Sequence, residues 1–165
     1  MERSATASAR ADGPDAAILE VLQAATRVLA GVALRSVDVL HGAVSLPQFR
    51  VLAVLEDLGP SRSGRVARAL GLEPSTVTRL ADRLVASGHV RRGGDPRHRS
   101  VVTLELTSSG RQLVARVREW RHAELSRILG GLAPADREAT ARALRLLVDA
   151  AGDGYGSLRR GLVPL

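Results

Sequence analysis

Residues 66–80 read Val-Ala-Arg-Ala-Leu-Gly-Leu-Glu-Pro-Ser-Thr-Val-Thr-Arg-Leu, and the prediction of the fold starts from them. Apolar residues at helical spacing on both sides of Gly71 predict two short helices. Glycine suits the left-handed residue that ends a helix, and Pro74 suits the first turn of the next one. Leu72 is expected to hold the second helix against the first. The pattern predicts a helix-turn-helix, although many ordinary helix pairs match it too.

The second of these helices carries polar side chains along its N-terminal half. Hydroxyl groups reach phosphates and bases, a threonine methyl packs on a thymine methyl, and arginine pairs bidentately with guanine. The residue types therefore predict a helix that lies in the major groove of DNA. The candidate contacts are Ser75, Thr76, Thr78, Arg79 and Arg83, together with Ser63 and Arg65 from the preceding helix.

The chain after the helix-turn-helix predicts a basic β-hairpin. Residues 89–92 and 100–106 have the character of strands, and the turn-rich segment 93–99 lies between them. A helix-turn-helix followed directly by such a hairpin is a winged helix. Arg97 at the predicted tip suits the narrow minor groove, where the negative potential is strongest. Asp95 is expected to hold a neighbouring arginine in place. The other candidate contacts of the hairpin are Arg91 and Arg99.

Positive charge is concentrated in this same region. The chain has 165 residues and a net charge of +7, and residues 61–100 hold nine arginines against three acidic residues. A positive block between nearly neutral segments indicates a surface that meets a polyanion. Two classes of protein fit this charge. One is a sequence-specific DNA-binding regulator, and the alternative is a nucleoid-type architectural protein that binds DNA through phosphate with little sequence preference.

Long amphipathic segments flank the predicted winged helix. Residues 15–41 predict one helix that ends near Gly42, and a helix of about 27 residues is too long for one compact domain to cover. Its broad apolar face suggests a partner chain. The whole pattern predicts a mainly α-helical fold with a small β-wing. The expected domain bounds are 1–14 for a disordered tail, 15–151 for the domain, 46–106 for its DNA-binding part and 152–165 for a C-terminal tail.

Composition and motifs exclude several other classes of protein. There is no cysteine, so disulfides, thiolate zinc sites and cysteine nucleophiles are ruled out. No enzyme or cofactor is expected, because no phosphate-binding glycine loop, nucleophile elbow or paired-carboxylate pattern occurs. The lack of an apolar run of ~18–20 residues and of a signal peptide predicts a cytoplasmic protein without a membrane partner. His41, Glu119 and His122 are conceivable metal ligands, but scattered surface histidines are commoner, and no metal is predicted.

The order of these motifs resembles the MarR family of multiple-antibiotic-resistance-type regulators. The resemblance covers roughly residues 15–151. Its most specific part is Asp-Pro-Arg-His-Arg at 95–99 followed by Leu-Thr-Ser-Ser-Gly at 106–110. It implies a homodimer in which the helices within 15–42 and 107–151 pair across a two-fold axis. Two winged lobes would then straddle a pseudo-palindromic operator.

The same resemblance implies a ligand-responsive repressor of transcription. Family members release DNA when a small effector, often phenolic or anionic, binds between the dimer helices and the DNA-binding lobe. Arg97 resembles the family's wing arginine, and Asp95 resembles the acid that orients this arginine. The residues that resemble the family's recognition contacts are Ser75, Thr76, Thr78 and Arg79. The sequence departs from the family at His98, where an acid is usual, and at Ser100, where a second basic residue is common. The effector itself is not identified.

Overall fold

The computed structural model describes residues 15–95 and 98–152, and describes side chains outside 95–101. Its elements confirm the expected class, mainly α-helical with one two-stranded antiparallel sheet. The expected tail 1–14, and all of the expected tail 152–165 except Gly152, lie outside the described residues. In chain order the elements are α1 (Ala16–Asp38), α2 (Leu46–Leu58), α3 (Ser63–Leu70), α4 (Pro74–Ala86), β1 (Val90–Asp95), β2 (His98–Leu106), α5 (Ser108–Gly130) and α6 (Pro134–Ala151).

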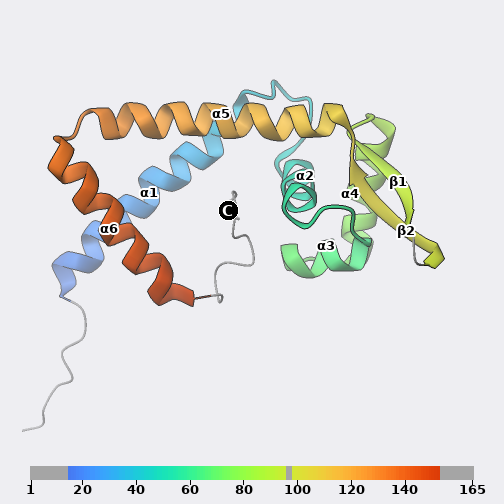
Figure 1. Ribbon diagram of the computed structural model, residues 1–165, viewed down its shortest axis with the longest axis horizontal. Helices are drawn as coiled ribbons and strands as arrows, with labels where there is room; N and C mark the ends of the chain where they lie inside the picture. Colours follow the sequence, from blue (N-terminus) through green and yellow to red (C-terminus); the bar gives the residue numbers. More distant parts are fainter. Residues whose placement is uncertain (1–14, 96–97, 153–165) are drawn as a thin grey trace, which may run out of the picture.

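The molecule is elongated, and α5 connects its two ends (Figure 1). Helices α2, α3 and α4 and the β-hairpin form one end, which we call the winged lobe. Helices α1 and α6 lie at the other end of α5. The contact between the N- and C-terminal parts of the chain is made by α1 against α5. Helix α6 contributes no buried residue.

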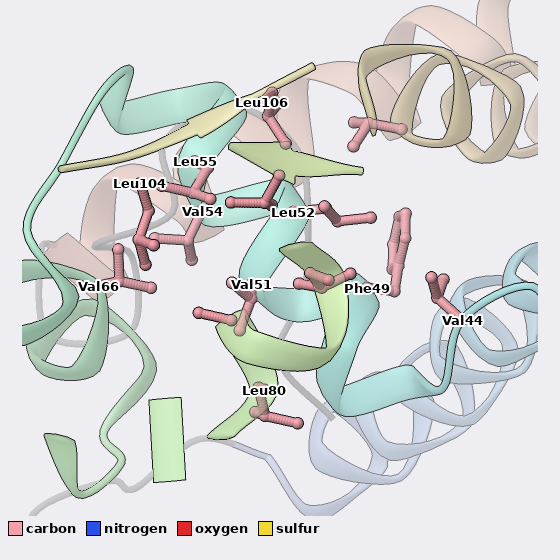
Figure 2. Close-up of a cluster of buried hydrophobic side chains, with 14 of the residues drawn as sticks. Val44, Phe49, Val51, Leu52, Val54, Leu55, Val66, Leu80, Leu104 and Leu106 are labelled. Atoms are coloured by element: carbon pink, nitrogen blue, oxygen red, sulfur yellow. The ribbon is translucent and has the colours of Figure 1, made fainter. Parts of the chain in front are cut away.

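The core of the winged lobe is centred on α2. This helix begins with a capping box, in which the Ser45 N–H donates to Gln48 Oε1 at 2.7 Å, and Pro47 lies in its first turn. Residues 51–55 are all buried, so α2 is covered on every side. Figure 2 shows its side chains packed among Val66 of α3, Leu80 of α4 and the two leucines of β2.

The turn between α3 and α4 has the predicted geometry. Gly71 ends α3 in the left-handed region with φ 64° and ψ 33°, and the Leu72 N–H donates to the Ala67 carbonyl at 3.0 Å. Leu72 is half-buried against the core, and α4 begins at Pro74. The helix-turn-helix expected from the sequence is therefore confirmed.

Replacing Gly71 tests this turn. We expect Gly71→Ala to lower the free energy of unfolding by about 1–2 kcal/mol, because a Cβ disfavours the left-handed conformation. No atom lies close enough to clash with the added methyl group, so the effect comes from the backbone alone. Gly71→Asn is the matched control and is expected to lose less, since asparagine tolerates this region. Urea denaturation that gives equal stability for all three proteins would contradict the assignment.

The wing is a hairpin whose strands are longer than the sequence predicts. β1 and β2 pair in antiparallel register from Val90↔Leu106 to Gly94↔Val102, with an irregularity after Gly94. Ser61 adds a bridge to Leu104, so the segment before α3 is tied to the wing by two backbone hydrogen bonds. The pairing extends beyond the expected ends because the glycines at 93 and 94 lie within the ladder rather than in the turn.

Helix α1 ends earlier than predicted, at Asp38, and a tight turn follows. His41 and Gly42 both have positive φ in that turn, of 48° and 77°. The contact of α1 with α5 includes Ser36, which is fully buried and accepts a hydrogen bond from Arg121 Nη2 at 2.8 Å. Burial lowers the pKa of the Arg121 guanidinium from its usual value. The two helices therefore meet through a polar contact as well as through apolar side chains.

Helix α1 is long and apolar enough to cross a membrane, by length and composition only. Its most apolar stretch has a high mean hydropathy, and only 11% of that stretch is buried. The expectation from the sequence concerned uninterrupted apolar runs, and α1 is not one, because Glu20 and Arg27 interrupt its apolar residues. Helices that pack in a protein core and signal sequences pass the same test. The finding is therefore weak evidence for a membrane.

Candidate nucleic-acid interface

Helix α4 has a buried side and an exposed side. Val77, Leu80 and Leu84 recur at helical spacing and are buried in the core of the winged lobe. This packing fixes the rotation of α4 about its axis, and the polar residues consequently face away from the core. The residues placed on the exposed side are those that the sequence singled out, Ser75, Thr76, Thr78, Arg79 and Arg83.

Two features of this exposed side decide what it offers to a ligand. Ser75, Arg79 and Arg83 are four residues apart, so they form one row along the helix. The Thr78 hydroxyl donates to the Pro74 carbonyl at 2.9 Å, so its hydrogen is already used within the helix. Thr78 can thus present its methyl group and an oxygen lone pair, whereas the arginines present N–H donors suited to guanine edges or phosphates.

Helix α3 packs beside α4 and adds further basic residues. Ser63 is half-buried at the first position of α3, and Arg65 is exposed, as a surface contact requires. Arg62 and Arg68 are exposed as well, although they were not among the predicted contacts. The spacing of three residues from 62 to 65 to 68 is the signal that could have found them, because residues three apart lie on one side of a helix.

Both arginines of β1 are paired with acidic residues. Arg91 forms an ion pair with Glu105, its cross-strand neighbour, and Arg92 forms one with Asp82 of α4. The pair between Arg92 and Asp82 links β1 of the wing to α4. Exposed ion pairs contribute only about 0–1 kcal/mol, so Arg91 stays a candidate contact. The role of Arg92 was not predicted, because a partner ten residues away on another element leaves no local pattern.

The tip of the wing is described in part. Arg97 lies outside the described residues, and the candidate side chains of Asp95 and Arg99 are likewise not described. The backbone pairing of Asp95 with His98 places the two strand ends opposite each other. The roles expected of these three residues therefore stay predictions.

Comparison with known proteins identifies the family. The sequence model of the MarR family matches residues 44–99, the part that contains the helix-turn-helix and most of the wing. The crystal structure of RV1404 from Mycobacterium tuberculosis is similar over the whole fold, with a TM-score of 0.78, 34% identity and coverage of 87% of this chain and 99% of that one. The chain belongs to the MarR family. It is thus a winged helix-turn-helix protein of a family of transcriptional regulators, which is not a family of enzymes.

Two further proteins are similar to this MarR-family chain, one at lower sequence identity and one over a smaller part of the chain. A MarR family protein from Bacillus stearothermophilus has a TM-score of 0.72 at 26% identity, covering 82% of this chain and 96% of that one. The uncharacterized HTH-type transcriptional regulator YfiV of Bacillus subtilis is 32% identical over 104 residues, which are 63% of this chain and 65% of YfiV. The chain thus matches just under two thirds of the length of this curated relative.

The described histidine side chains of this MarR-family chain, His41, His89 and His122, lie in different parts of the fold. Among the described residues no group of three histidine, aspartate or glutamate side chains is close enough to hold a metal ion. His41 lies in the turn after α1, whereas Glu119 and His122 are exposed on α5. The metal site that the sequence left open therefore has no support from these positions.

Proposed function

We propose that this protein is a sequence-specific DNA-binding regulator of transcription that acts as a homodimer. The observation that carries the proposal is α4, whose apolar side is locked in the core while its serine, threonines and arginines are exposed. Such a helix delivers several base-reading side chains in a fixed orientation, which sequence recognition in the major groove requires. The positive block around it supplies the phosphate contacts that hold the helix in register.

Relatives support DNA as the partner and repression as the outcome. The HTH-type transcriptional repressor NicR of Pseudomonas putida is 30% identical over 102 residues, which are 65% of its length. FabT of Streptococcus pneumoniae, solved in complex with DNA, shares the fold at a TM-score of 0.68 and 20% identity. We assign Arg97 to the minor groove, Arg99 to the nearby phosphates and Asp95 to orienting Arg97. Arg65 and Ser63 are assigned to the phosphate backbone.

Dimerisation is supported by the apolar residues that the single chain leaves exposed. Large apolar side chains are uncovered along α1 and along the second half of α6, far more than an isolated domain of this size needs at its surface. A second copy of the same chain would cover both helices symmetrically. The exposed residues are Ile18, Leu19, Val21, Val28, Leu29 and Leu34 on α1 and Leu144, Leu146, Leu147 and Val148 on α6.

Control by a small effector is part of the proposal. The DNA-binding activity of BpsR from Bordetella bronchiseptica, which shares 26% identity and a TM-score of 0.53 with this chain, is regulated by 6-hydroxynicotinic acid. A ligand that binds better when the two lobes are wrongly spaced lowers DNA affinity by its differential binding to that state. The effector of this chain is left open.

The test is selection of bound fragments from a random duplex library at near-physiological salt. Enrichment of an inverted repeat with half-sites about one helical turn apart is the expected result, because a two-fold dimer presents two α4 helices. Binding without an enriched motif would instead support an architectural protein that reads only phosphate. A protein that retains no duplex at all would overturn both candidates.

Arg79→Ala separates base reading from phosphate binding. We expect this variant to lose about 1–3 kcal/mol of discrimination at one base pair of each half-site, since a bidentate contact to guanine is removed. Arg116→Ala, an exposed arginine of α5, is the charge-matched control and should leave the preference unchanged. Competition binding with single-base variants of the selected site measures the effect. Equal weakening of all sequences would show that Arg79 contacts phosphate only.

A further inference from the structure

A pocket lies between the start of α3 and strand β2. Its volume is about 540 Å³, in the range of small-ligand sites. We call it the α3–β2 pocket. Its lining residues are Pro60, Ser61, Arg62, Gly64, Arg65, Arg68 and Thr103.

The charged residues that line the α3–β2 pocket are all basic. Three of its seven lining residues are arginines, and none is acidic. The pocket also includes the N-terminal turn of α3, where the N-cap residue Arg62 makes no side-chain capping hydrogen bond. Backbone N–H groups at the start of a helix carry a partial positive charge and favour anions. Arginine side chains and helix N-terminal N–H groups without a capping side chain together match the oxygens of a phosphate group.

Two buried hydroxyl groups in the wall give independent support. Ser61 and Thr103 line the pocket and are only 3% and 7% exposed, yet neither hydroxyl oxygen has a hydrogen-bond partner among the described residues. A buried hydroxyl without a partner destabilises the folded protein, so nearly all such groups in proteins find one. Two of them beside one cationic pocket indicate a ligand that supplies acceptor oxygens.

We infer that the α3–β2 pocket binds a phosphate group, carried either by a free small molecule or by the DNA backbone. The pocket is several times larger than one phosphate group, and this leaves room for the organic part of a phosphate-bearing small molecule. The DNA source rests on the proposed function, whereas the free source does not. In both cases the site is separate from the base-reading row on α4, because its residues come from α3, the segment before it and β2.

Titration of the full-length ¹⁵N-labelled protein with inorganic phosphate at constant ionic strength, without DNA, tests the free source. Amide signals of residues 63–65 are expected to shift and saturate, while chloride at the same ionic strength leaves them in place. Arg68→Ala is expected to weaken the binding about tenfold, as loss of a charged hydrogen bond implies. Arg116→Ala is the charge-matched control, and it should bind phosphate as the unmodified protein does.

Thr103→Val distinguishes a ligand-binding hydroxyl from a structural one. The variant keeps the shape of the side chain and removes the unpartnered oxygen, so it is expected to be at least as stable as the unmodified protein. Its phosphate affinity is expected to fall. A variant that loses stability but keeps its phosphate affinity would assign the hydroxyl to folding and count against the site.

Titration with a short DNA duplex forms the second arm. Shifts of residues 63–65 with free phosphate support a small-molecule source, and shifts with the duplex alone support a backbone phosphate. If the duplex binds but neither titration moves these amides, the inference is overturned together with the phosphate contacts assigned to Ser63 and Arg65. If Arg68→Ala has no effect on phosphate binding, the inference alone is overturned. In both cases the proposed DNA-binding function stands. Failure of the duplex to bind would count against the proposed function, and the phosphate titration would still decide on the pocket.

Discussion

Replacing Leu146 and Val148 of α6 by glutamate is expected to convert the proposed dimer into monomers. These side chains are 70% and 68% exposed in the single chain, where a surface substitution changes stability by only about 0.5 kcal/mol. They are two residues apart and so lie on different sides of the helix, and a partner that covers α6 meets at least one of them. A buried carboxylate without a partner is then strongly unfavourable. Dissociation of the double variant would therefore show that a second chain covers α6.

Sedimentation velocity measures the dissociation, and DNA binding measures its consequence. A dimer holds two recognition helices on one operator, so its loss is expected to lower affinity roughly 10²–10⁴-fold. Val102→Glu is the matched control for sedimentation, because this valine of β2 is also exposed, at 57%, and lies in the winged lobe. A double variant that sediments like the unmodified protein would contradict the proposed interface.

The second large effect is expected for Gly110→Ala. Gly110 is buried where α5 leaves the wing, and a Cβ there would lie 2.1 Å from the His89 carbonyl oxygen and 3.2 Å from Leu106 Cδ2. The His89 carbonyl cannot move away freely, because it accepts the Thr107 N–H at 3.1 Å. The Thr107 hydroxyl also donates to the Gly88 carbonyl at 2.7 Å. The methyl group must therefore displace backbone on both sides of the junction.

We expect Gly110→Ala to lower the free energy of unfolding by about 2–3 kcal/mol, the range of severe overpacking. Gly64→Ala is the matched control, since nothing lies within 4 Å of its added Cβ and alanine favours a helix. The control should be as stable as the unmodified protein or slightly more stable. Chemical denaturation of both variants provides the comparison. Equal stabilities would mean that the backbone around Gly110 makes room for the methyl group without a cost in free energy.

The helix-turn-helix and the wing were predictable because their signals are local. Gly71, Leu72 and Pro74 are neighbours, and each requirement of the turn is met within a few residues. The rotation of α4 followed from helical spacing, which sorts Val77 and Leu80 to one side regardless of the rest of the chain. The exposed position of the candidate contacts on α4 therefore follows from the spacing of its apolar residues.

Contacts between distant segments were not predictable in the same way. The pairing of Arg92 with Asp82 depends on how β1 returns beside α4, and no spacing rule encodes it. The α3–β2 pocket joins lining residues between Pro60 and Arg68 to Thr103, and the bridge between Ser61 and Leu104 holds these two segments together. The close approach of Gly110 to His89 likewise arises from packing. Gly110 lies within α5 and not in a turn, so no turn geometry requires a glycine there.

The amino-acid order is enough to predict the order of elements, the helix-turn-helix with its polar face, and the concentration of positive charge. These properties arise from backbone preferences and side-chain periodicity over a few residues. The folded chain is needed to know which charges are paired, which hydroxyls are buried without a partner, and which apolar helices stay uncovered. The physical reason is that burial and pairing depend on distances between segments far apart in the chain, and folding sets those distances by packing the whole core at once.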